Sequence, residues 1–213
     1  MVPPGIPNSH LDDFRQTVID PAAWRSHASV LRSAADSLWD LAIENLLSSP
    51  KQLKDPLLRE EVCRRFADQL HTAQFMYGLA VEAGLKAQVI EMDPTKVEFC
   101  EKRDGHGVVV DLRVRRIGVD LSIEGHDLNR LAEVVGVFDG RIGKVCTTNS
   151  DQQTLQEILA FLTKCVRWSG RYPAPKSTAE YYNPKHQVPR VALSHYMRDW
   201  LDPLLDALLP GSA

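Results

Sequence analysis

The 213 residues include 44% hydrophobic and 25% charged side chains, which is typical of a globular protein with enough apolar surface to bury a sizeable core. The formal net charge of −3 argues against a protein that coats nucleic acid through bulk positive charge, so any contact with phosphates is expected to be local. The four cysteines form neither a Cys-x-x-Cys pair nor a cluster with zinc-ligand spacing, which predicts a reducing compartment and no structural metal.

The N-terminal region, residues 1–28, is rich in proline and polar residues. It lacks the charged start and apolar run of a signal peptide, and the chain contains no stretch of about 18 uncharged apolar residues. We therefore predict a complete cytoplasmic protein without a membrane segment and without a cofactor. We interpret residues 1–28 as a loosely attached arm, with room for one short helix, in front of a single domain over residues 29–209.

Two helices are predicted to follow this arm. Between Ser29 and Leu47, apolar residues recur at intervals of three and four, which is the pattern of an amphipathic helix. Asp55 and Pro56 are typical of an N-cap followed by proline at the first helical position, and helix-compatible sequence continues to Met92. The second half of this long helix is crowded with alanine and glycine, so we expect it at the centre of a bundle.

Residues 96–124 change to an alternating, β-branched pattern, which predicts a small antiparallel β insertion in a mainly α protein. The Asp104-Gly105 pair predicts a hairpin turn, and Gly118 a second turn. Alternation places Arg113 and Arg115 on one face, which is either a solvated face or an edge that binds RNA or a partner protein. The basic residues of this segment are Lys102, Arg103, Arg113, Arg115 and Arg116.

Helical patterns return after the insertion. The first begins near His126 and ends at Gly136, a residue type that often caps helix C-termini. Ser150 and Gln153 form a capping-box pattern before the next amphipathic helix. The last predicted helix begins at Pro189 and carries an apolar face, which completes a mainly α domain.

Three segments, taken in order, resemble the HEPN-domain family of bacterial proteins. They are YGLAVEAGLKA (residues 77–87), GHDLNRLAEVVG (125–136) and VRWSGRYPAPK (166–176), and the resemblance covers roughly Val62 to Lys176. It implies an up-and-down helical bundle, frequent homodimers and a link to RNA or nucleotides. Many members are ribonucleases of toxin-antitoxin or antiviral defence systems, whereas others are non-catalytic binding or interaction modules.

Ribonucleases of this family carry an arginine followed, after four to six residues, by a histidine. Arg190 and His195 match this pattern, although Val191 stands where catalytic members usually have a polar residue. The resemblance implies His195 as general acid or base and Arg190 as a phosphate clamp at a helix start. Arg65 and His71 are a second match, for which we favour a solvated helix face.

Glu82 and Lys86 are four residues apart on the alanine-rich helix, so they lie on one face and can pair. If they are buried they need further partners. The candidates are His126, Asp127, Arg167 and Arg171. This cluster is either a polar network that fixes helix register or the lining of a pocket for a nucleotide or another anionic ligand.

Cations and rings alternate at a predicted helix exit, where they could stack a base and hold its phosphate. They are Arg167, Trp168, Arg171 and Tyr172. The alternative is that Trp168 and Tyr172 anchor the core and the arginines pair with acids.

Several enzyme classes lose support because their motifs are missing. The chain has no phosphate-binding Gly-x-x-x-x-Gly-Lys loop, no Gly-x-Gly-x-x-Gly after a strand, no Gly-x-Ser-x-Gly and no His-Glu-x-x-His. Two hypotheses remain: a metal-independent endoribonuclease with Arg190 and His195 as its catalytic pair, or a non-catalytic module that binds a nucleotide or a partner protein.

Overall fold

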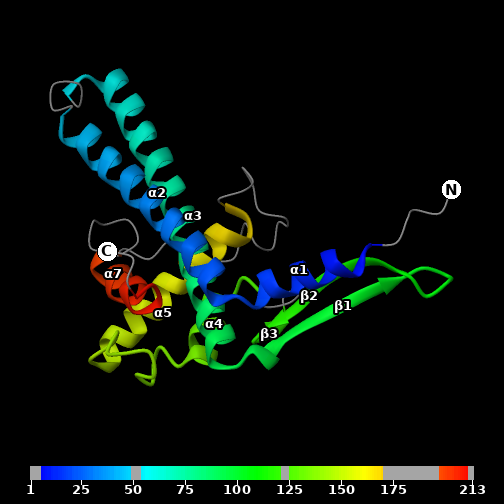
Figure 1. The fold of residues 1–213 in the computed structure, drawn as a ribbon. Helices are drawn as coiled ribbons and strands as arrows, with labels where there is room; N and C mark the ends of the chain where they lie inside the picture. The colour runs from blue at the N-terminus through cyan, green and yellow to red at the C-terminus, as the bar shows by residue number, and fades with distance from the viewer. Residues whose placement is uncertain (1–5, 49–53, 121–124, 170–196, 211–213) are drawn as a thin grey trace, which may run out of the picture.

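The computed structural model describes residues 6–48, 54–120, 125–169 and 197–210, and shows the predicted mainly α protein with a small antiparallel sheet (Figure 1). Some predictions concern residues outside these ranges, namely Arg171, Tyr172, Pro189, Arg190 and His195. The helices are α1 (Asn8–Ile19), α2 (Pro21–Leu47), α3 (Pro56–Met92), the short η2 (Pro94–Lys96), α4 (Leu128–Val135), α5 (Asn149–Lys164), the π-helical turn η3 (Cys165–Ser169) and α7 (Met197–Leu208).

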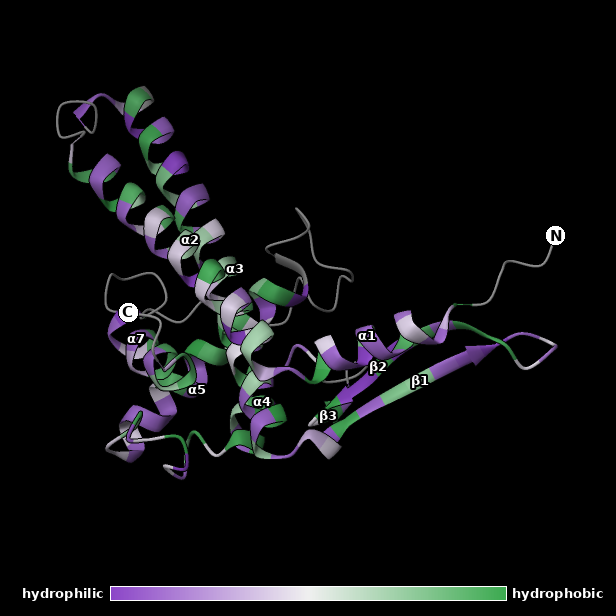
Figure 2. Ribbon diagram, viewed as in Figure 1, coloured by the Kyte–Doolittle hydropathy of each residue, from purple (hydrophilic) through white to green (hydrophobic). Residues whose placement is uncertain are grey.

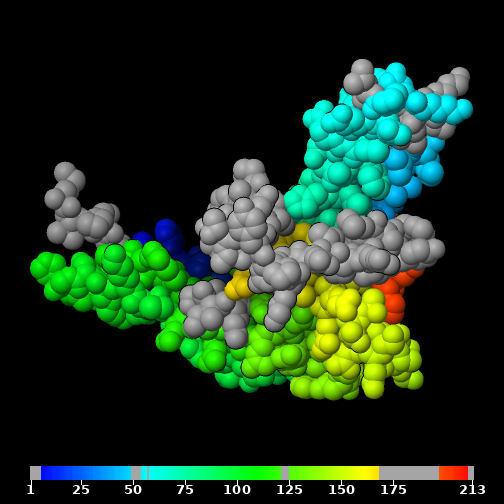
Figure 3. Space-filling model, turned by 180° about the vertical axis from the view of Figure 1, so that it is seen from behind, coloured from blue at the N-terminus to red at the C-terminus, as the bar shows by residue number. Residues whose placement is uncertain are grey.

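Helices α2 and α3 form a long hairpin whose far end stands clear of the rest of the molecule (Figures 1 and 3). The bounds predicted for α3 are confirmed, but the helix start predicted at Ser29 is wrong, because α2 begins at Pro21. Asp20 caps it by accepting a hydrogen bond from the Ala22 N–H at 2.9 Å. This is the same Asp-Pro signal that marks the start of α3.

The alanine- and glycine-rich half of α3 lies at the centre of the core, as predicted. Tyr77, Ala80 and Leu85 are completely buried there. A Cβ atom added to Gly78 would lie 2.6 Å from Val166 Cγ2 and 3.3 Å from the Leu162 carbonyl oxygen. Only glycine permits this close approach of α3 to the α5–η3 segment.

The predicted β insertion is a three-stranded antiparallel sheet of β1 (Val97–Arg103), β2 (Val109–Ile117) and β3 (Val119–Asp120). At the hairpin turn, Asp104 Oδ1 accepts hydrogen bonds from two backbone N–H groups, and the positive φ of 81° falls on Gly107. The turn predicted at Gly118, where φ is 70°, is confirmed.

Helix α1 covers one face of this sheet. The rings of Phe14 and Phe99 meet edge to face with centroids 6.2 Å apart, and Arg15 forms an ion pair with Glu101 at 2.7 Å. The short helix that we allowed in the N-terminal arm is therefore packed on the sheet, which extends away from the helical body (Figure 1).

The remaining helices are fixed by local caps. Gly136, with φ 82°, ends α4 as predicted. The capping box of helix α5 lies two residues before the predicted Ser150–Gln153 box, because Thr148 and Asp151 form it. Thr148 has the extended backbone of an N-cap, and its hydroxyl accepts from the Asp151 N–H at 3.1 Å.

Hydrophobic residues gather where α3, α4, α5 and α7 meet, and others lie among hydrophilic residues along the far end of the hairpin (Figure 2). Among the described helices, none combines the length and the apolar character needed to cross a membrane. The four cysteines are free.

Candidate functional site

The predicted catalytic pair, Arg190 and His195, lies outside the described residues, so its role stays a prediction. The second match is described. Arg65 is exposed and forms an ion pair with Glu61 at 2.8 Å. Residues with the spacing of Arg65 and His71 are about 120° apart around a helix, so the two side chains do not lie on the same face. Arg65 therefore lies on a solvated helix face, as we favoured, whereas His71 is half-buried.

The predicted Glu82–Lys86 pair is present and buried in the core. Lys86 Nζ donates to Glu82 Oε1 at 2.5 Å, and His126 Nδ1 lies 2.9 Å from Glu82 Oε2. Lys86 Nζ also lies 5.7 Å from the ring centroid of Trp24 on α2. Burial on its own raises the pKa of Glu82, but the His126 hydrogen bond and the Lys86 charge outweigh it, so the pKa is lowered.

The trio Glu82, Lys86 and His126 ties α3 to the chain just before α4, which supports the register role. The side chains of Glu82 and Lys86 are 10% and 7% exposed, whereas that of His126 is 38% exposed. An external ligand would therefore meet only His126. Asp127 does not join the trio, because its carboxylate caps α4 by accepting from the Arg130 N–H at 3.0 Å.

The proposed stacking surface at the end of α5 is only partly described. Arg167 is exposed on η3, while Arg171 and Tyr172 lie outside the described residues. The possible base-stacking role of these residues and of Trp168 stays a prediction.

The basic face of the sheet is largely neutralised. Arg113 pairs with Asp111 at 2.6 Å, and Arg116 pairs with Glu98 at 3.0 Å. Arg103 also has a carboxylate partner on its own strand. These contacts favour the solvated, ion-paired face over an RNA-binding edge.

A reciprocal ion-pair network joins α2 to α7 and was missed in the sequence. Both helices carry the same pattern, Arg-x-x-x-Asp-x-x-x-Asp, as the triplets Arg32, Asp36, Asp40 and Arg198, Asp202, Asp206. Each arginine reaches both aspartates of the opposite helix. Arg32 lies 3.2 Å from Asp202 and 2.6 Å from Asp206, and Arg198 lies 3.4 Å from Asp36 and 3.0 Å from Asp40.

Tyr77 connects this network to the core of the bundle. Its hydroxyl donates to Asp36 Oδ1 at 2.5 Å, and its ring meets Trp39 edge to face at 6.0 Å. Burial of the ring and the hydrogen bond to the Asp36 carboxylate raise the pKa of Tyr77 well above its ordinary value, because ionisation would place a second negative charge beside Asp36.

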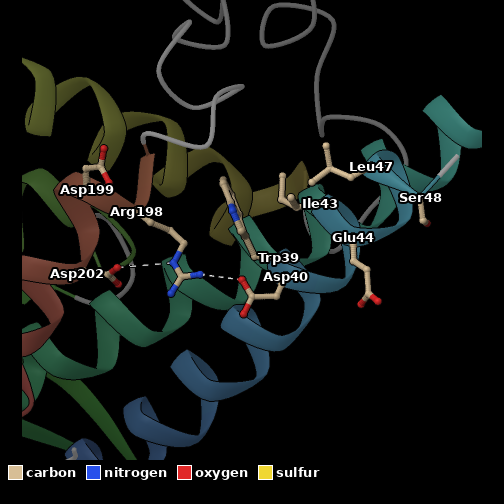
Figure 4. Close-up of a pocket in the computed structure, with 9 residues that line it drawn as sticks. All are labelled: Trp39, Asp40, Ile43, Glu44, Leu47, Ser48, Arg198, Asp199 and Asp202. Atoms are coloured by element: carbon tan, nitrogen blue, oxygen red, sulfur yellow. Dashed lines mark hydrogen bonds and ion pairs between the residues drawn. The ribbon is translucent and has the colours of Figure 1, made fainter. Parts of the chain in front are cut away.

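A groove with a volume of about 760 Å³ opens beside this network, between the C-terminal half of α2 and the start of α7 (Figure 4). Its acidic lining residues are Asp40, Glu44, Asp199 and Asp202, and its larger apolar ones are Trp39, Ile43 and Leu47. Figure 4 shows Arg198 reaching across from α7 to Asp40. In the part of the chain that the structure describes, no three His, Cys, Asp or Glu side chains come together as metal ligands.

The groove can therefore bind a ligand that carries an apolar group next to a positive charge. Its carboxylates disfavour the binding of a phosphate group. Among the described residues that line the groove, Arg198 is the one cation, and carboxylates from both helices surround it. A repeated Arg-Asp spacing in two helices was the sequence signal for this site, but only the fold brings the two copies together.

Comparison with family models, with curated proteins and with solved structures finds no match for this chain. The HEPN resemblance of residues 77–87, 125–136 and 166–176 therefore stays a prediction.

Proposed function

We propose that this protein is a non-catalytic interaction module that holds a partner protein in the α2–α7 groove. The observation that carries the proposal is the lining of the groove, which combines carboxylates with the exposed side chain of Leu47 and the half-buried one of Ile43. Leu47, on the wall of the groove, is 74% exposed. Exposed apolar surface rimmed by charge is typical of a surface that binds another protein.

The pairing of arginines supports a protein partner over RNA. Phosphate binding uses cations that are free to replace counterions. Most arginines in the described ranges instead contact a carboxylate: Arg15, Arg25, Arg32, Arg65, Arg103, Arg113, Arg116, Arg130, Arg141 and Arg198. The ribonuclease hypothesis for Arg190 and His195 is a separate prediction.

Site-specific photo-crosslinking tests the proposal. A photoreactive amino acid replaces Leu47 in the full chain, and a matched variant carries it at Arg115, which is exposed on the sheet. In the cells that make the protein, we expect a discrete protein adduct from position 47 and none from position 115. A second copy of this chain as the adduct would identify the module as a homodimer.

Adducts from position 115 alone would move the partner surface to the β insertion and contradict the proposal. RNA crosslinked at position 47 would also contradict it, because the carboxylates of the groove repel phosphate.

A further inference from the structure

The acidic stripe of α2 extends beyond the two aspartates that Arg198 of α7 contacts. Asp36, Asp40 and Glu44 follow one another at intervals of four residues, so they lie along one face of the helix. Arg198 contacts Asp36 and Asp40 but leaves Glu44, which comes one turn later. Within the described ranges, no hydrogen bond or ion pair involves the Glu44 carboxylate. The stripe thus offers one more position for a cation like Arg198.

The opposite wall of the groove carries a second carboxylate without a cation. Asp199 is exposed in the first turn of α7, directly after Arg198. It has no ion pair with any residue that the structure describes. Glu44 and Asp199 therefore come from different helices and line the same groove (Figure 4).

Apolar surface accompanies these two acids. Ile43 is half-buried and packs on the core, and Leu47 is one helical turn further along α2. Both line the groove that Glu44 and Asp199 share. A ligand that carries charge alone would leave the Leu47 side chain in water.

From these observations we infer that the occupant of the groove is a short basic, amphipathic protein segment. Its arginine or lysine side chains pair with Glu44 and Asp199, and an apolar side chain packs on Ile43 and Leu47. The ion pair between Arg198 and Asp40 is an example, within the chain itself, of a cation bound to the acidic face of α2. The inference rests on the proposed function and specifies the chemistry of the partner.

Fluorescence anisotropy with a synthetic peptide tests this inference. The probe is a labelled helical peptide of about 14 residues, or four turns, with arginine and leucine on one face. Its control replaces each arginine with glutamate. We expect saturable binding of the basic peptide alone, weakened by added salt because exposed charges are screened.

Two isosteric variants test whether the peptide binds in the groove. Glu44→Gln and Asp199→Asn should each weaken binding about two- to fivefold, as expected for one exposed ion pair, and the double variant about tenfold if the sites act independently. Neither carboxylate has a partner among the described residues, so the fold is preserved. Asp13→Asn on α1, another exposed acid, is the matched control and should bind like the wild type.

Equal binding of the glutamate peptide, or unchanged affinity of the double variant, would overturn the inference. If position 47 crosslinks a protein but the basic peptide does not bind, the inference fails while the proposed function stands. If both experiments are negative, both are overturned.

Discussion

The buried Glu82–Lys86 pair makes a quantitative prediction about stability. The Lys86→Met variant keeps most of the side-chain volume but leaves Glu82, which is 10% exposed, with His126 as its remaining partner. Removing one member of a buried pair typically costs about 3–5 kcal/mol. Because His126 still contacts Glu82, we expect the lower end, a loss of about 3 kcal/mol in the free energy of unfolding.

Urea denaturation followed by circular dichroism at pH 7 measures this loss. The control is Arg65→Met, which breaks an ion pair of the same i,i+4 spacing on the same helix, but an exposed one, and should cost less than about 1 kcal/mol. The double variant Glu82→Leu/Lys86→Met should recover much of the stability that Lys86→Met loses, since no unpaired buried charge remains. Equal losses for Lys86→Met and Arg65→Met would refute the reasoning.

Further variants test the remaining physical arguments. The pKa of Tyr77 is raised in the folded protein, so the stability that Tyr77 contributes is fully present below pH 10.0, its ordinary pKa, and is lost as the pH rises above it. Tyr77→Phe should therefore reduce the loss of stability at alkaline pH in a pH series of urea melts. The pKa of Glu82 is lowered, so the stability that Glu82 contributes is present above pH 4.5, its ordinary pKa, and is lost as the pH falls below it. Glu82→Gln should therefore reduce the loss of stability at acidic pH. Gly78→Ala should cost about 1–3 kcal/mol through overpacking against Val166. If the ribonuclease hypothesis holds, RNA cleavage persists in EDTA and disappears in His195→Ala; cleavage by that variant would remove His195 from the mechanism.

Local signals in the sequence predicted the elements that depend on them. Asp55 and Pro56 marked the start of α3, and Gly118 and Gly136 marked turns because both need positive φ. The same reasoning failed at Asp20 and Pro21, where the proline-rich character of residues 1–28 hid a helix start.

The candidate site was harder to predict because its parts come from distant positions. The i,i+4 spacing was enough to pair Glu82 with Lys86, since one helix carries both. Asp40 and Arg198 are far apart in the sequence, and neither helix alone shows that the other lies beside it. His126 was foreseen as a partner of Glu82, but Asp127 was not foreseen as the cap of α4.

Hydrogen–deuterium exchange of the full chain tests the central claim most directly. The account predicts that the basic peptide slows amide exchange in residues 38–48 of α2 and at the start of α7, and that single-stranded RNA at the same ionic strength leaves both segments unchanged. Protection of these segments by RNA, or protection by the peptide only on the sheet, would contradict the account.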